Sequence, residues 1–286
     1  MTKRVPSDFL AVIFCGGASV RMGPLATVQP KTLLPAYDER LLWRQIEQLR
    51  DAGCTPIVVS TTPRYELQIR QEIESRARSM GAESVSAVLG CAEQENGLLA
   101  GLRSIFQSKS AETVLLCLGD IFFRYNPFTS LQAHFEADYD CILAAPVIIP
   151  GELDRGGLIL HRGDRVERVI EQPKGEVLDD ALRWTGVALL NRRRALVGLD
   201  SFLATAPAGA PPGDFLDFQC RNGVVSRLVE TPDFVNVNSP DDLLLASLYA
   251  RLERETGQSS FSKELSRFAR SFRHELASRS RDRSQT

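Results

Sequence analysis

The sequence predicts an α/β protein: a Rossmann-like, mostly parallel twisted sheet with helices on both faces and a small mixed β excursion. Short β-branched or leucine-rich runs bounded by turn residues predict buried strands, and they alternate with segments of helical spacing up to about residue 140. That alternation is typical of a parallel sheet. The expected strands are Leu10–Cys15, Pro56–Thr61, Ser84–Leu89, Thr113–Leu118, Asp140–Pro146, Gly157–His161, Arg165–Glu171, Thr185–Asn191 and Gly223–Leu228.

Apolar residues at helical spacing predict the helices between these strands. The first helix, Arg40–Gly53, carries Leu42, Gln45 and Ile46 on one face, and its last glycine fits a C-terminal cap. The final one begins near Ser239, a residue suited to the N-cap, with proline at the first helical position. The other expected helices are Glu66–Met80, Asn96–Ser108 and Thr129–Phe135.

The pattern changes after residue 140, where strands follow one another through short turns, as expected for the mixed excursion. Ala206–Asp214, rich in proline and glycine, is expected to be a loop. We expect one domain over residues 1–252, and a C-terminal helix with a disordered basic tail over 253–286. Apolar residues on one face of that helix predict packing on its own domain or on a neighbouring subunit of a homo-oligomer; a membrane surface or an acidic partner are the alternatives. These residues are Phe261, Leu265, Phe268, Phe272 and Leu276.

Composition excludes several classes of protein. The formal net charge of −2 gives no basic field for nucleic acid. No apolar run approaches the ~18 residues of a membrane span, and the N-terminus lacks the cleavage site of a signal peptide. Six cysteines without a C-x-x-C pair, four of them inside apolar runs, are typical of reduced core thiols. We therefore expect a cytoplasmic protein with no membrane partner.

The stretch FCGGASVRMGP, Phe14–Pro24, follows the first strand and predicts a phosphate-binding turn. A Walker A string is absent, and a G-x-G-x-x-G fingerprint is broken after the second glycine. Paired glycines let the backbone approach a triphosphate, Arg21 can clamp phosphate oxygens through its fork of donors, and Lys31 in VQPKTLLP comes to the same side. The expected nucleotide-binding turn consists of Gly16, Gly17, Ala18 and Ser19.

This opening resembles the signature of the sugar-1-phosphate nucleotidylyltransferases, also called NDP-sugar pyrophosphorylases: an apolar strand, then G-G-x-G-T-R-(L/M)-x-P, a gap, and P-K. Ser19 and Val20 depart from the usual Gly-Thr, and GG-x-S-x-RMG is similar to relatives that transfer GMP to molybdopterin. The resemblance covers roughly residues 10–252 and implies the fold of the nucleotide-diphospho-sugar transferases. The matching residues are Gly16, Gly17, Arg21, Met22, Pro24, Pro30 and Lys31.

The sequence also predicts a Mg²⁺ site. Asp120 in CLGD comes just after a buried strand, where a carboxylate faces the phosphate crevice. Mg²⁺ takes one or two protein oxygens and fills its other positions with phosphate and water oxygens. By the resemblance, the second ligand comes from a late D/N-x-G/N-T/S-P-x-D motif, where FVNVNSPDD supplies Asn236. Asn238, two residues on, is alternatively a cap for the following helix.

The resemblance further implies an acceptor side and a base-reading turn. Glu171 in VIEQPK stands where the family binds acceptor hydroxyls; Gln172 replaces the usual lysine, and Lys174 is the expected substitute cation for the acceptor phosphate. The glycine of TGV, Gly186, would let the acceptor lie against the backbone. In QENGLLAGL the expected contacts with the nucleobase are Asn96 and Gly97.

The implied enzyme is a Mg²⁺-dependent nucleotidyltransferase that joins a sugar 1-phosphate to the α-phosphate of a nucleoside triphosphate, releasing pyrophosphate and an NDP-sugar. A phosphate monoester is already an anion near neutral pH, so the reaction needs no general base, and Arg21, Lys31 and Asp120 are the expected catalytic residues. Two alternatives remain: the same chemistry on phosphocholine, a phosphonate, a polyol phosphate or molybdopterin, or a non-catalytic nucleotide-binding regulatory subunit. The nucleobase and the acceptor stay open.

Overall fold

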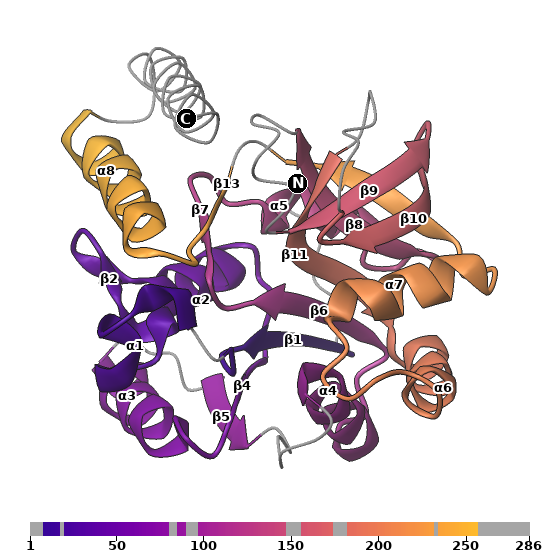
Figure 1. Cartoon of the computed structure of the whole chain (residues 1–286), viewed down its shortest axis with the longest axis horizontal. Coiled ribbons are helices and arrows are strands. Elements are labelled where there is room, and N and C mark those ends of the chain that lie inside the picture. The colour runs from indigo at the N-terminus through magenta and orange to yellow at the C-terminus, as the bar shows by residue number, and fades with distance from the viewer. Residues whose placement is uncertain are drawn as a thin grey trace, which may run out of the picture.

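A computed structural model describes residues 8–17, 20–79, 85–89, 97–146, 156–173, 182–231 and 234–256. Within these residues the central feature is one large twisted sheet flanked by helices (Figure 1). Its strands, in spatial order, are β5 (Val85–Leu89), β4 (Ile57–Thr61), β1 (Phe9–Phe14), β6 (Thr113–Leu118), β11 (Leu182–Asn191), β8 (Asp140–Pro146), β12 (Ser226–Glu230), β10 (Arg165–Glu171) and β9 (Gly157–Arg162).

Most strands of this sheet point the same way. β5, β4, β1 and β6 pair in parallel. β11 is antiparallel to both β6 and β8, which leaves β8 aligned with β6, and β12 is parallel to β8. β10 runs against β12 and β9. Only β10 and β11 are therefore reversed within the described sheet, and the expectation of a mostly parallel sheet is confirmed.

Two small ladders and the helices complete the described part of the chain. β2 (Pro35–Ala36) pairs with β3 (Glu39–Arg40), and β7 (Ile121–Phe123) pairs with β13 (Phe234–Asn236). The longer helices are α2 (Leu41–Asp51), α3 (Glu66–Ser79), α4 (Gly97–Ser108), α6 (Arg192–Leu203), α7 (Pro212–Arg221) and α8 (Pro240–Thr256). The short ones are η1 (Val20–Met22), α1 (Leu25–Val28), η2 (Lys31–Leu33), α5 (Phe128–Leu131) and η3 (Gln132–His134).

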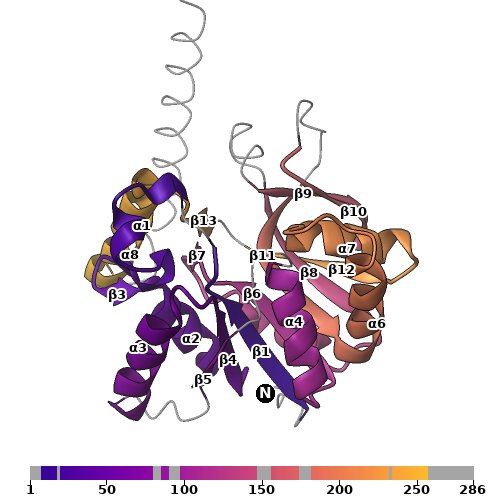
Figure 2. The same ribbon diagram turned by 60° about the horizontal axis from the view of Figure 1, so that its bottom comes forward.

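The sheet separates two hydrophobic cores. Along β1, Ala11 and Ile13 enter the core beneath α2 and α3, while Val12 and Phe14 enter the core beneath α4, α6 and α7. Figure 2 shows α2 and α3 on one side of the sheet and α4 and α6 on the other. Alternate residues of a strand point to opposite faces, so a strand buried on both faces must be apolar throughout, as FLAVIF is.

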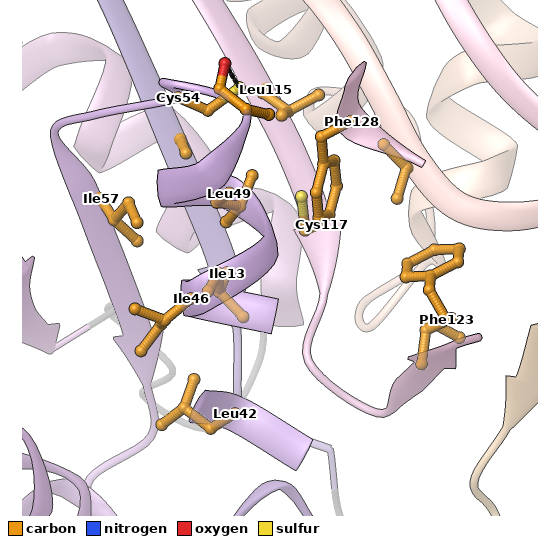
Figure 3. Close-up of a cluster of buried hydrophobic side chains, with 14 of the residues drawn as sticks. Ile13, Leu42, Ile46, Leu49, Cys54, Ile57, Leu115, Cys117, Phe123 and Phe128 are labelled. Atoms are coloured by element: carbon orange, nitrogen blue, oxygen red, sulfur yellow. Dashed lines mark hydrogen bonds between the residues drawn. The ribbon is translucent and has the colours of Figure 1, made fainter. Parts of the chain in front are cut away.

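The first core is built mainly by α2 against β1, β4 and β6. Leu42, Ile46 and Leu49 of this helix point at the sheet and meet Ile13 and Cys117 there (Figure 3). The side chains of Leu42, Ile46 and Leu49 are each 0% exposed. No disulfide supports this packing among the five cysteines of the described residues, four of which are buried, in line with the expected core thiols.

The expected elements are recovered in the first half, with ends that differ by a few residues. The expected mixed β excursion is present: β8 to β12 pair in both directions and extend the same sheet. The second half also contains α6, which the sequence did not predict. The expected loop Ala206–Asp214 is wrong at its end, because α7 already begins at Pro212, a residue compatible with a first helical turn. The predicted domain boundary at 252 stays a prediction, since the description ends with α8 at Thr256 and the amphipathic tail lies outside the described residues.

We predict that packing on α2 dominates stability. Leu49→Ala should lower the free energy of unfolding by about 2–5 kcal/mol, because Leu49 is 0% exposed and its loss leaves a cavity. Leu67→Ala, the same change at a 67% exposed site on α3, should stay within about 0.5 kcal/mol. Urea unfolding monitored by circular dichroism measures both values, and equal losses would contradict the assignment of the core.

Candidate active site

The candidate site lies where β1 and β6 end side by side. Phe14 pairs with Leu118, and the Gly119 N–H donates to the Phe14 carbonyl at 2.9 Å. A Cβ at position 119 would lie 2.8 Å from the Phe14 carbonyl oxygen and 2.9 Å from Cys15 Sγ. Only glycine fits this close approach, and it places Asp120 directly beyond the carboxyl end of β6, as the sequence predicted.

Two of the predicted catalytic residues meet there. Lys31, on η2, forms an ion pair with the Asp120 carboxylate and donates from Nζ to Asn238 Oδ1 at 3.0 Å. Lys31 is only 7% exposed. A buried ammonium needs such partners, because its desolvation is costly without them. The contacts with Asp120 and Asn238 therefore hold the Lys31 side chain in one position.

Asn236, the second predicted metal ligand, comes to the same place through the short β7–β13 ladder. Asn236 pairs with Ile121, the neighbour of Asp120, and the Val237 N–H donates to the Asp120 carbonyl at 2.9 Å. Its Oδ1 is buried and has no hydrogen-bond partner within the described residues. Asp120 and Asn236 therefore offer oxygen ligands of the type that Mg²⁺ prefers. Among the described residues, no group of three or more His, Cys, Asp or Glu side chains forms a complete metal cage.

A small cavity of about 80 Å³ opens beside these residues. Gly17, Lys31, Thr32 and Asp120 line its polar side, and its apolar wall includes Leu98 and Leu118. Leu98 belongs to α4 and immediately follows Gly97, one of the two predicted contacts with the nucleobase. Typical ligand pockets measure about 300–1,000 Å³, so this cavity would take only part of a nucleotide. A larger depression of about 380 Å³, lined by Arg162, Arg165 and Glu167 among others, contains none of the predicted site residues.

Sequence reasoning missed two residues that fix this arrangement. Gln45, 1% exposed on α2, donates from Nε2 to the carbonyls of Leu118 at 2.9 Å and Ile121 at 2.7 Å, which brackets the turn that carries Asp120. A glutamine on the apolar face of a helix was the available signal. Asn238 was considered only as a helix cap, but its side chain contacts Lys31, and Ser239 caps α8.

The other predicted nucleotide contacts are only partly brought together. Gly16 lies against the end of β4, where a Cβ would come within 2.8 Å of Thr62 Cγ2, and Gly17 lines the cavity. The side chain of Arg21, on η1, is exposed and does not line the cavity. Its role as a phosphate clamp stays a prediction. Ala18, Ser19 and Asn96 lie outside the described residues.

Of the predicted acceptor contacts, Gly186 approaches the cavity wall through Leu118. It adopts a φ of +79°, and a Cβ there would sit 3.0 Å from Leu118, a residue of the cavity wall. The β11–β8 register shifts between Trp184 and Ala188, so this glycine occupies a bulge. Lys174 lies outside the described residues.

Glu171 ends β10 and is held by α7 rather than by the cavity. The Gly213 N–H donates to Glu171 Oε1 at 3.1 Å, in the first turn of that helix. Burial raises the pKa of Glu171 to about 7, and the charge of Asp214 adds to the effect, while the Gly213 N–H opposes it. Asp120 and Glu171 therefore sit in different surroundings: Asp120 is paired with a cation, and Glu171 has no ion pair with any residue that the structure describes.

Residues 11–175 match the model of a family described as the MobA-like NTP transferase domain. This match covers more than half of the chain. The chain belongs to this family. The predicted relationship to the nucleotidylyltransferases is confirmed.

None of the helices in the described part of the chain has the length and apolar character needed to cross a bilayer.

Curated relatives bear names of that chemistry. The chain is 29% identical over 169 residues to a mannose-1-phosphate guanylyltransferase catalytic subunit beta from Drosophila pseudoobscura pseudoobscura, covering 57% of this chain and 43% of the relative. It is 27% identical over 175 residues to a mannose-1-phosphate guanyltransferase from Neurospora crassa, covering 57% of this chain and 44% of the relative. The chain thus spans less than half the length of these two relatives.

Solved structures confirm the fold. An inositol-1-phosphate CTP transferase from T. maritima superposes with a TM-score of 0.69 at 17% identity, over 89% of this chain and 99% of that one. A UDP-glucose pyrophosphorylase complexed with UDP-glucose gives a TM-score of 0.70 at 16% identity, over 86% and 99%. The expected fold of the nucleotide-diphospho-sugar transferases is therefore present in this member of the family.

We predict that Glu171 makes stability depend on pH. Its pKa is about 7 in the fold and 4.5 as its ordinary value, so ionisation costs folding free energy as pH rises between these values. Glu171→Gln removes this cost. The difference in free energy of unfolding between Glu171→Gln and the parent should therefore increase in favour of the variant from pH 5 to pH 8, by at most about 3 kcal/mol. Urea unfolding at both pH values measures the gain.

Glu167→Gln is the matched control, since Glu167 is an exposed carboxylate on the same strand. It controls for the general effect of removing a negative charge from this strand. A Glu171→Gln difference no more pH-dependent than that of Glu167→Gln would contradict the raised pKa of Glu171.

Proposed function

We propose that this chain is a nucleotidylyltransferase that joins a sugar 1-phosphate to the α-phosphate of a nucleoside triphosphate and releases pyrophosphate. The observation that carries the proposal is the cluster of Lys31, Asp120 and Asn236 at the carboxyl ends of β1 and β6, beside a cavity that also reaches Gly17. Ligands of open α/β sheets bind at this edge. The names of the curated relatives support the same reaction.

The chemistry requires no base from the protein. A phosphate monoester has a second pKa near 6, so the acceptor oxygen is already an anion at neutral pH. It forms a bond to the α-phosphorus while the bond from that phosphorus to the bridging oxygen breaks, and pyrophosphate leaves with the electron pair. Catalysis then depends on positioning and on charge stabilisation.

Lys31 is suited to the central role in that stabilisation. Its ammonium is buried and held by two acceptors, so it would meet the developing charge on the α-phosphate without reorganising. Arg21 would hold the β- and γ-phosphates, which its exposed position next to the glycine turn permits. Glu171, Lys174 and Gly186 remain the proposed contacts with the acceptor.

The oxygen donors of the site fit Mg²⁺. Asp120 offers a carboxylate and Asn236 a buried amide oxygen that lacks a partner, and a two-ligand site leaves positions for phosphate oxygens. A bound Mg²⁺ would supply charge neutralisation for the triphosphate. We propose that these two residues hold it, and that removing Mg²⁺ with EDTA abolishes turnover.

The first substrates to assay are GTP and mannose 1-phosphate, which the names of the curated relatives suggest. A panel of four NTPs against hexose 1-phosphates, phosphocholine and polyol phosphates would separate the sugar reaction from the same chemistry on another acceptor. NTP binding with no turnover on any acceptor would favour a regulatory subunit instead.

We predict that Asp120→Ala and Lys31→Ala each lower kcat by about 100-fold or more, the scale of losing a principal electrostatic group. Pyrophosphate release in a coupled assay measures the rate. Asp200→Ala is the matched control for the aspartate, because Asp200 pairs with Arg103 on the surface, and it should retain parental turnover. Near-parental pyrophosphate release by Asp120→Ala would refute the assigned site.

A further inference from the structure

The hydrogen bond from Lys31 to Asn238 joins parts of the chain that lie far apart in sequence. Lys31 Nζ donates to Asn238 Oδ1 at 3.0 Å while it pairs with Asp120. A lysine has a long, flexible stem, and one partner alone leaves its ammonium free to swing about that partner. Two acceptors from different segments fix the ammonium position.

Asn238 is itself held firmly. Its backbone N–H donates to Asp242 Oδ2 at 3.1 Å, and the Ser239 N–H and hydroxyl donate to the same oxygen at 2.9 and 2.7 Å. The Asp242 N–H in turn donates to Ser239 Oγ at 3.3 Å. This reciprocal arrangement is a capping box at the start of α8. The first turn of α8 therefore sets where the Asn238 side chain stands.

The two asparagines of this segment have different partners. Asn236 Oδ1 is buried without a hydrogen-bond partner in the described residues, whereas Asn238 Oδ1 is occupied by Lys31. Between them Val237, 0% exposed, is tied by its N–H to the Asp120 carbonyl. The segment 236–238 thus supplies the proposed metal ligand, Asn236, and also the residue that contacts the proposed catalytic lysine, Asn238.

We infer that Asn238 is a positioning residue, which holds the Lys31 ammonium in place for the α-phosphate while Asn236 is left to the metal. This inference rests on the proposed function. An amide suits the role because it accepts a hydrogen bond without adding charge. A carboxylate at position 238 would place a second negative charge beside Lys31 and repel a triphosphate.

The activity test is a double-mutant cycle with GTP, mannose 1-phosphate and Mg²⁺, read as kcat and KM from pyrophosphate release. Asn238→Ala should lower kcat about 10- to 100-fold, the loss expected for one hydrogen bond to a charged group. In a Lys31→Ala background the same change should cost less than about twofold, because the group it positions is gone. Asn238→Asp should raise KM for GTP.

Asn191→Ala is the matched control. The Asn191 side chain accepts from the Arg194 N–H at the start of α6, so Asn191→Ala removes an asparagine side-chain hydrogen bond away from the cavity. It should leave kcat and KM unchanged. Thermal unfolding of each variant verifies that it folds, and Asn238→Leu, similar in size but without an acceptor, replaces Asn238→Ala if that variant does not fold.

A second test needs no turnover. Acetic anhydride labelling of the full chain, followed by peptide mass spectrometry, reports how readily each lysine is reached. In Asn238→Ala, Lys31 should react about fivefold faster, in line with the loss of one hydrogen bond, while the exposed Lys109 reacts unchanged. Unchanged labelling of Lys31 would overturn the inference, even if the chain turns over none of the assayed substrates.

The outcomes separate the two proposals. Equal losses from Asn238→Ala in the parent and in Lys31→Ala would overturn the positioning role and leave the proposed function standing, as would parental kcat in Asn238→Ala. A fully active Lys31→Ala would refute the proposed catalytic lysine itself. Faster labelling of Lys31 in Asn238→Ala together with a coupled loss of kcat supports both.

Discussion

The ion pair between the buried Lys31 and the partly buried Asp120 is the constraint on which the candidate site depends. Lys31 is 7% exposed, and such a charge is stable in a protein only with a close counter-ion and further polar contacts. Satisfying it requires η2, the end of β6 and the segment after β13 to meet at one point. Three features bring these segments together: the pairing of β1 with β6, the close approach of Gly119 to the end of β1, and the β7–β13 ladder.

The surrounding packing gives this pair a rigid frame. α2 both fills the first core with Leu42, Ile46 and Leu49 and turns one polar side chain, Gln45, toward the Asp120 turn. An amide buried in such a place restrains the backbone it donates to, because losing either bond would leave a carbonyl without its partner. The same helix thus contributes stability to the fold and geometry to the site.

Local patterns in the sequence were enough for the parallel half of the sheet. Together with the family resemblance they singled out Lys31, Asp120 and Asn236, which the fold brings to one place; the roles of these residues stay predictions. Local patterns were not enough for β7 and β13, three residues each, which exist only because they pair with one another. α6 was missed because it opens with three arginines, whose positive charge is unfavourable at a helix N-terminus, and because it contains Gly198, a weak helix former. Gln45 and the lysine contact of Asn238 were missed because long-range contacts, and no local spacing, define them.

β11 is shared by both halves of the sheet: it pairs with β6 toward the candidate site and with β8 and β9 toward Glu171. Within the described residues, one continuous sheet therefore joins the two halves. Rigid-body rotation of one half against the other would therefore break hydrogen bonds of β11, which is costly. Closure around substrates would cost less if the peripheral turns and one-turn helices, such as η1 and α1, moved locally against the fixed sheet.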